Sequence, residues 1–189
     1  MNFGITVSYI IGGLMLISIL TLNNTVMQDS YKHTVEMTTS TQVDEIRRML
    51  MHDMQYLAFG YDSDILNFSD EHIRFKALYR GQTRVFSWEL KNSGYNDTSN
   101  PNDKTLQRNG PMDDKPGSTM SKYPAVTFNV TAYSDEEGNV VAASKDQIRS
   151  ILVELVVQSA EPVGSYDDGT PRYSETGWKK LFLPDNIMI

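Results

Sequence analysis

The chain has 189 residues, 40% of them hydrophobic and 22% charged, which suits one modest folded domain with appendages. Its 17 Lys and Arg against 24 Asp and Glu give a formal net charge of −7. This balance argues against nucleic-acid binding, which needs a basic face to displace phosphate counterions. The absence of cysteine excludes disulfides, thiolate zinc sites, iron–sulfur clusters and cysteine nucleophiles.

The first predicted element is an uncharged apolar helix at residues 5–22. It measures about 27 Å at helical rise, at the short end of what spans a bilayer core. A secretory signal peptide begins with Lys or Arg and ends in a small-residue cleavage site, and neither is evident here. A retained transmembrane half-helix at 1–22 is therefore favoured over a cleaved signal. Gly12 and Gly13 would let another helix approach closely, or are simply tolerated in a membrane span.

The helix is predicted to continue as an amphipathic stalk at 23–60. No Gly or Pro interrupts residues 23–59, and Gly60 is suited to close the helix. One apolar stripe with spacings of three and four should pack on the domain. The stripe consists of Val43, Ile46, Leu50, Met54 and Leu57. The Thr-rich stretch at 33–42 has weaker helix propensity and is either a soft joint or a continuation.

Residues 61–189 predict an antiparallel β-rich globular domain. Alternating runs at 72–80 and 83–90, around a short Gly-containing turn, predict a hairpin. The stretch near 91–124 is dense in Asn, Asp, Gly, Pro and Ser and predicts a long exposed loop. A short strand at 104–109 is the one element expected inside that loop.

A second hairpin is predicted from the runs at 125–134 and 140–144, which flank an acidic Gly-containing turn. In this turn Asp135, Glu137 and Asn139 offer the oxygen ligands that calcium prefers. The same composition is typical of a hairpin turn with no ion bound, and both interpretations stay open.

The last predicted elements are a β-branched central strand at 151–157, ending by Pro162, and a short strand at 178–187. A helix is the alternative at 151–157. The fold class is therefore α+β: a long N-terminal helix, part membrane span and part stalk, packed on an antiparallel β-sheet.

Catalytic motifs are not evident. The three His, His33, His52 and His72, are not at metal-ligand spacing, and there is no nucleophile elbow, zincin, phosphate-loop or dinucleotide pattern. The chain is expected to be non-enzymatic and without a resident cofactor, calcium apart. A membrane-tethered enzyme would need distant carboxylates brought together by folding.

The order of elements resembles the type IV pilin superfamily, and most closely the J-type minor pseudopilins of type II secretion and the W-type minor pilins. The matching stretches are "IRFKALYRGQTRVFSWEL", "KTLQRN", "VTFNVTAYSDEEGNVVAASKDQIRSILVELVVQSAEP" and "WKKLFLPDNI". The resemblance implies a pilin-like fold and a structural subunit of a pilus or secretion filament. Such a subunit packs its N-terminal helix against other pilin-like subunits in the lipid bilayer, and its β domain lies outside the cytoplasm as part of a single-pass protein.

The resemblance also assigns roles to residues near the N-terminus. Gly4 would be the last leader residue and Ile5 the first mature one. Tyr9 stands at the fifth mature position, where the family usually has Glu, and this departure favours a minor or tip subunit over a major one. Tyr9, Gly12 and Gly13 are the expected packing residues in the membrane. The alternative is a single-span accessory subunit of another envelope complex, with the β domain as a binding module.

Overall fold

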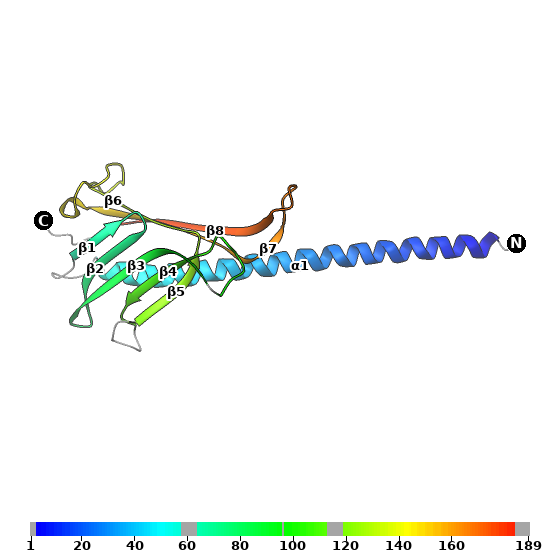
Figure 1. Cartoon of the computed structure of the whole chain (residues 1–189), viewed down its shortest axis with the longest axis horizontal. Coiled ribbons are helices and arrows are strands. Elements are labelled where there is room, and N and C mark those ends of the chain that lie inside the picture. Colours follow the sequence, from blue (N-terminus) through cyan, green and yellow to red (C-terminus); the bar gives the residue numbers. More distant parts are fainter. Residues whose placement is uncertain (1–2, 58–63, 96, 113–118, 184–189) are drawn as a thin grey trace.

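The computed structural model consists of one very long helix and two antiparallel sheets (Figure 1). It describes residues 3–57, 64–95, 97–112 and 119–183. The C-terminal half of the helix lies against the sheets, and its N-terminal half projects beyond them (Figure 1). This is the α+β arrangement expected from the sequence.

The helix α1 (Phe3–Leu57) runs without interruption through the Thr-rich stretch. Seven of its hydroxyl groups donate hydrogen bonds to the carbonyl oxygen four residues back. They belong to Ser18, Thr21, Thr25, Thr34, Thr38, Thr39 and Thr41. Because these side chains bond within the helix, they do not draw the backbone out of helical geometry. The stretch at 33–42 is thus a continuation of the helix. The proposed end at Gly60 lies outside the described residues.

Only the second half of α1 contributes to the core. All five residues of the predicted stripe are at most 4% exposed. Leu50 is completely buried, and Thr39 and Asp53 are buried on the same side. Residues 3–34, by contrast, are exposed throughout. The helix therefore changes from an amphipathic core element to a free rod within one unbroken element.

The larger sheet has five antiparallel strands in chain order. They are β1 (Asp64–Ser69), β2 (His72–Tyr79), β3 (Gln82–Gly94), β4 (Lys104–Gly110) and β5 (Thr119–Ala125). The β2–β3 turn places Arg80 and Gly81 at φ 49° and 76°, the left-handed geometry of a tight two-residue hairpin. The short strand expected at 104–109 is confirmed as β4, whereas the expectation of an otherwise irregular loop near 91–124 is wrong, because β3 extends to Gly94 and β5 begins at Thr119.

The smaller sheet has the order β6-β7-β8. Its strands are β6 (Thr127–Tyr133), β7 (Ser150–Ser165) and β8 (Pro171–Phe182). A short 3-10 turn, η1 (Lys145–Gln147), precedes β7. Towards the N-terminal half of α1, the β7–β8 hairpin reaches the helix at Tyr31, whose hydroxyl donates to Glu161 Oε2 at 2.7 Å.

Three details of this sheet differ from expectation. Residues 140–144 form only an isolated bridge between Tyr133 and Val141, and the strand that pairs with β6 along its whole length is β7. β7 passes Pro162, which sits at an irregularity in the ladder where its missing N–H is tolerated. β8 begins earlier than the expected 178, directly after the tight turn that follows β7.

The core lies where the inner faces of both sheets meet α1, which contacts β2, β7 and β8. Aromatic rings dominate it. Phe75 and Phe86 stack with centroids 5.2 Å apart, and Trp88 lies 6.3 Å from Phe128 of the smaller sheet. These side chains are completely buried. The ring contacts join β2, β3 and β6 into one core under the helix.

Candidate functional site

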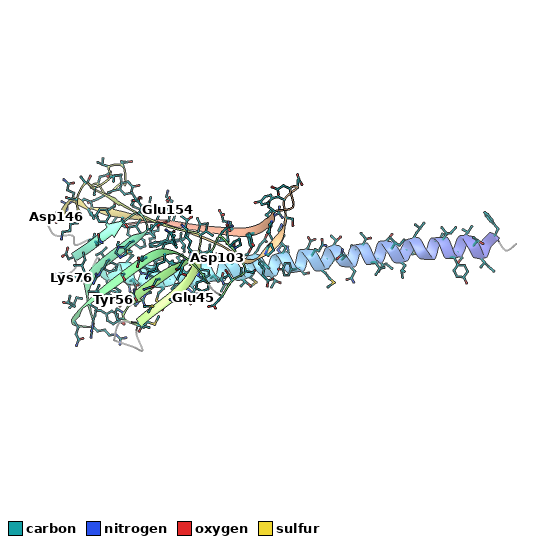
Figure 2. All side chains as sticks on the ribbon, viewed as in Figure 1. Glu45, Tyr56, Lys76, Asp103, Asp146 and Glu154 are labelled. Carbon is teal, nitrogen blue, oxygen red and sulfur yellow. The ribbon has the colours of Figure 1, made fainter. Side chains whose placement is uncertain are left out.

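The free half of α1 exposes a long run of large apolar side chains. Its large side chains stand out from the rod (Figure 2), among them Ile10, Ile11, Leu14, Met15 and Leu16, each 54% to 64% exposed. By length and composition this helix can cross a membrane, and it is the one described helix that can. No Asp, Glu, Lys or Arg occurs from Phe3 to Gln28, a length of about 38 Å at helical rise.

The expected packing residues of this segment lie on one side of the rod. Tyr9, Gly12 and Gly13 are spaced i, i+3 and i+4, so they share a helix face. A Cβ placed on either glycine would meet nothing within 4 Å, and Tyr9 is 78% exposed. Gly4 and Ile5, the expected processing residues, lie in the first turn of the same helix. This face has no partner within the described chain.

A buried ionic junction joins α1 to the larger sheet. The Asp53 carboxylate accepts hydrogen bonds from Arg108 Nε and Nη2 at 2.7 Å each, and from the Trp88 indole at 2.8 Å. Arg108 Nη2 also donates to the Pro111 carbonyl at 2.9 Å. All of Asp53, Arg108 and Trp88 is shielded from solvent. Such a pair fixes the rotation of α1 about its own axis, because both hydrogen bonds between Asp53 and Arg108 can form at only one rotation.

The junction was missed at the sequence level. Asp53 stands three residues after Leu50 and four before Leu57, so its place on the buried stripe is readable from the spacing. Arg108 alternates with Leu106 in β4, which places both on the inner face. What no local pattern shows is that these two positions, far apart in sequence, meet.

Beside the junction is a hollow of about 560 Å³ between α1 and the segment after β4. It is lined by Thr41, Glu45, Arg48, Met49, His52, Pro111 and Met112. The Thr41 hydroxyl donates to a helix carbonyl, and His52 Nδ1 lies 3.4 Å from an Asp53 oxygen that already accepts from Arg108. These described lining residues offer contacts for a partner side chain but no activated nucleophile.

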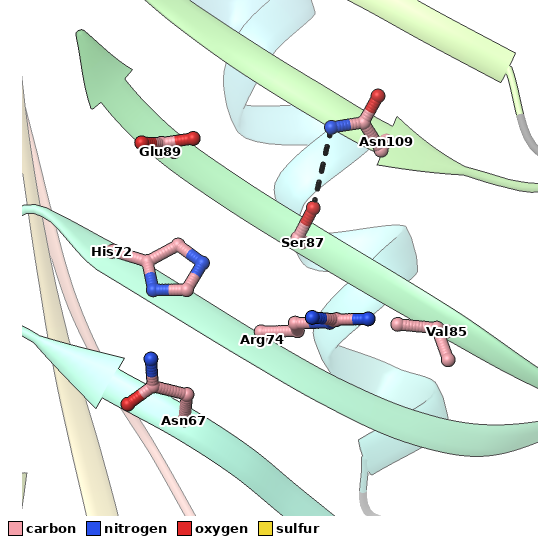
Figure 3. A pocket seen from close by; sticks show the side chains of 7 residues that line it. All are labelled: Asn67, His72, Arg74, Val85, Ser87, Glu89 and Asn109. Atoms are coloured by element: carbon pink, nitrogen blue, oxygen red, sulfur yellow. Dashed lines mark hydrogen bonds between the residues drawn. The ribbon is translucent and has the colours of Figure 1, made fainter.

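A second hollow, of about 430 Å³, lies on the outer face of the larger sheet (Figure 3). Its lining is polar except for one valine, and consists of Asn67, His72, Arg74, Val85, Ser87, Glu89 and Asn109. We call it the sheet-face hollow. Only His72 of this set stands out in the sequence, because the other residues are ordinary outward positions of separate strands.

The loop from β3 to β4 carries a buried carboxylate. Asp103 is 2% exposed, and neither of its oxygens has a hydrogen-bond partner in the described chain. Burial raises the pKa of this carboxyl; the nearby Thr98 hydroxyl lowers it in part without reaching hydrogen-bonding geometry. The loop itself is tied to β7, because the Asn100 amide donates to the Ser159 carbonyl at 3.0 Å. Asp103 is therefore held in place by its neighbours rather than by its own charge.

The acidic turn of the calcium hypothesis is closed by backbone amides. The Asp135 carboxylate accepts from the N–H groups of Val140 at 2.8 Å and Asn139 at 3.0 Å. These bonds hold the pKa of Asp135 below its ordinary value. The parts of the chain that the structure describes hold no group of three or more His, Cys, Asp and Glu residues arranged for a metal. Calcium at Asp135, Glu137 and Asn139 stays a prediction, with Asp135 already bonded to amides.

The histidines are not brought together. His33 is on the exposed part of the stalk, His52 is at the buried junction, and His72 is on the outer face of the larger sheet. Comparison with known proteins adds no further guide: no family model, curated protein or solved structure matches this chain. The surfaces described above are therefore what any assignment of function must rest on.

Proposed function

We propose that the chain is a non-enzymatic structural subunit of the pilin or pseudopilin type, in a type IV pilus or type II secretion filament. It is anchored in the bilayer by residues 5–22 and assembles with other pilin-like subunits through that segment. One observation carries the proposal: α1 continues unbroken from a half that packs on the chain's own domain into an apolar half with no intramolecular cover.

Helix–helix contact in lipid supports this use of the free half. Lipid chains are as apolar as leucine, so helices associate there through close packing rather than hydrophobic burial. The face with Tyr9, Gly12 and Gly13 combines an aromatic side chain with two positions that expose backbone. With Tyr9 in place of the usual Glu, a minor or tip position in the filament is the proposed one. Gly4 and Ile5 are the proposed processing point.

The β domain is proposed to lie outside the cytoplasm, in a single-pass arrangement. A phosphatase or a fluorescent protein fused at Ile189 reports this directly. Alkaline phosphatase is active only when exported, and green fluorescent protein is fluorescent mainly in the cytoplasm. An active phosphatase fusion is the expected result, and a fluorescent cytoplasmic fusion contradicts the proposed topology.

The test of assembly is the double substitution Gly12→Leu and Gly13→Leu. A Cβ at either position meets nothing within 4 Å and both positions are exposed, so folding and membrane insertion should be unchanged. Co-purification of partner subunits from the membrane should fall. Ser18→Leu is the matched control, a small-to-large change on the opposite side of the rod at 100° per residue. Undiminished assembly of the double variant would sink the packing hypothesis.

Mass spectrometry of the N-terminus tests the processing step. A mature chain that begins at Ile5, especially with a methylated amine, supports the pilin assignment. An intact Met1 favours the second candidate, a single-span accessory subunit of another envelope complex. The polar sheet-face hollow supports that candidate, because it gives the domain a binding surface independent of the helix. Purification of the native assembly distinguishes filament partners from a different complex.

A further inference from the structure

The outer face of the larger sheet is basic although the chain as a whole is acidic. Side chains alternate between the two faces of the sheet, so every second residue lies on the outer face and the residues between them face the core. Its charged members are four basic residues and two acidic ones. They are Arg74, Lys76, Lys91, Lys122, Asp64 and Glu89. A surplus of two positive charges here contrasts with the net charge of −7 for the whole chain.

Arg74 lies in the middle of this face. The strand register places Asn67, Arg74, Ser87 and Asn109 in one cross-strand row over four strands. Arg74 is exposed, and within the described residues its guanidinium forms neither an ion pair nor a hydrogen bond. Glu89, the acid of the hollow, is instead 3.7 Å from Lys91. Arg74 thus lies between Asn67 and Ser87 in the row, and its uncommitted guanidinium extends toward Val85 (Figure 3).

The neighbours of Arg74 add hydrogen-bond donors. Asn109 Nδ2 donates to Ser87 Oγ at 3.4 Å, which leaves the Ser87 hydroxyl hydrogen available to an incoming acceptor. The Asn67 amide lies on the other side of Arg74 in the same row. A guanidinium fork flanked by amide and hydroxyl donors matches the two oxygens of a carboxylate.

We infer that the sheet-face hollow binds a carboxylate side chain in an acidic segment of a partner polypeptide, with Arg74 as the anchor. The charge of the face selects such a segment, since opposite charges both attract and orient it. A lipid phosphate of the chain's own membrane is excluded by distance. The hollow lies near Asp53 of α1, because Ser87 of its lining is next to Trp88, and the Trp88 indole donates to Asp53. Asp53 is about 38 Å along the helix from Gln28, the last residue before the first charge. Only this exclusion rests on the proposed membrane anchor.

The test uses the full chain in detergent micelles with a fluorescein-labelled oligoglutamate peptide, read by fluorescence anisotropy at low ionic strength. Arg74→Gln should weaken binding about tenfold, the scale of one charge-assisted contact. Arg74→Lys should recover only part of the affinity, because it keeps the charge and loses the fork. Glu89→Gln should tighten binding about twofold by removing a like charge. Oligoglutamine should not bind.

Arg172→Gln is the matched control, because it removes the same charge from an exposed arginine at the far end of β8. It should leave the affinity unchanged, and circular dichroism should show all variants folded. Equal binding by wild type and Arg74→Gln overturns the inference, as does an equal loss in Arg172→Gln. So does Arg74-dependent binding of phosphatidylglycerol vesicles or of inorganic phosphate in preference to the peptide. Self-association abolished by Arg74→Gln, without peptide binding, would assign the face to a second copy and likewise overturn it.

Discussion

The carboxylate of Asp53 on α1 and the guanidinium of Arg108 on β4 form a two-point ion pair in which both residues are completely buried. The Trp88 indole is a third donor to the same carboxylate. The Asp53 carboxylate is well supplied with donors, whereas Arg108 Nη1 is buried without a hydrogen-bond partner in the described chain, so the pair still bears a desolvation cost. The helix is therefore joined to the sheet by an ion pair in which removing one partner alone is costly, because the other charge is left buried.

The first prediction concerns that asymmetry. Arg108→Met should lower the free energy of unfolding by about 3–5 kcal/mol, because it leaves the Asp53 charge buried without its partner. The double variant Asp53→Leu with Arg108→Met should lose less than the single one. Urea denaturation followed by tryptophan fluorescence measures both. Arg47→Met, which removes a partly exposed ion pair with Asp44, is the control and should cost less than about 1 kcal/mol.

The second prediction tests the stalk-to-domain contact. Leu50→Ala should lower the free energy of unfolding by about 2–5 kcal/mol, because it opens a cavity at a completely buried position without lowering helix propensity. Met51→Ala changes the next residue, which is 38% exposed, and should cost much less. Thermal unfolding of both variants gives the comparison. Equal losses would mean that the stripe is not what holds the helix on the domain.

The third prediction is that Asp103→Asn stabilises the protein at neutral pH. The pKa of this carboxyl is raised by burial, so the folded chain binds more protons than the unfolded chain between the two pKa values. Stability therefore falls as the pH rises through that window. The amide removes this dependence and should raise the free energy of unfolding at neutral pH, because it carries no charge that burial must desolvate. A less stable Asp103→Asn variant at neutral pH would contradict the account.

The fourth prediction has the opposite sign. The Val140 and Asn139 amides lower the pKa of Asp135 in the folded chain. The contribution of Asp135 to the free energy of unfolding is therefore present above its pKa in the unfolded chain, and is lost as the pH falls through its pKa in the folded chain. Asp135→Asn should flatten the acid limb of the stability profile. Amide hydrogen exchange at Val140 should become faster. Glu136→Gln, an exposed neighbour whose carboxylate accepts no hydrogen bond in the described chain, should change neither quantity.

The parts of the fold that could be predicted are those specified by short-range pattern. The stripe from Val43 to Leu57 repeats every three or four residues, and the hairpin of β2 and β3 has alternation on both sides of a tight turn. Each signal lies within a few residues, so it survives without knowledge of the rest of the chain. The strand at 151–157 was predicted for the same reason, from its β-branched run.

The missed elements depend on partners distant in sequence. β5 contains Ser121, Lys122 and Pro124, a poor strand composition, and it becomes a strand because β4 presents an open edge to it. β1 loses its alternation at the irregularity between Ile65 and Asn67. For the candidate sites the same holds: the face of Tyr9, Gly12 and Gly13 is local and was predicted. The sheet-face hollow draws on four strands and was not.

The uncharged part of α1 is longer than the apolar layer that it is proposed to cross. A bilayer core is about 30 Å thick, and the stretch from Phe3 to Gln28 measures about 38 Å. The hydroxyls of Ser18, Thr21 and Thr25 are bonded to the helix itself, so they need no new partner when they pass from water into lipid. Within this stretch Asn23, Asn24 and Gln28 carry amide side chains, so moving the proposed span along the membrane normal towards Asp29 would bring these amides into the hydrocarbon at a cost in desolvation. The depth of the proposed anchor is therefore expected to be set by the amides of Asn23 and Asn24 before the first charge, at Asp29, approaches the hydrocarbon.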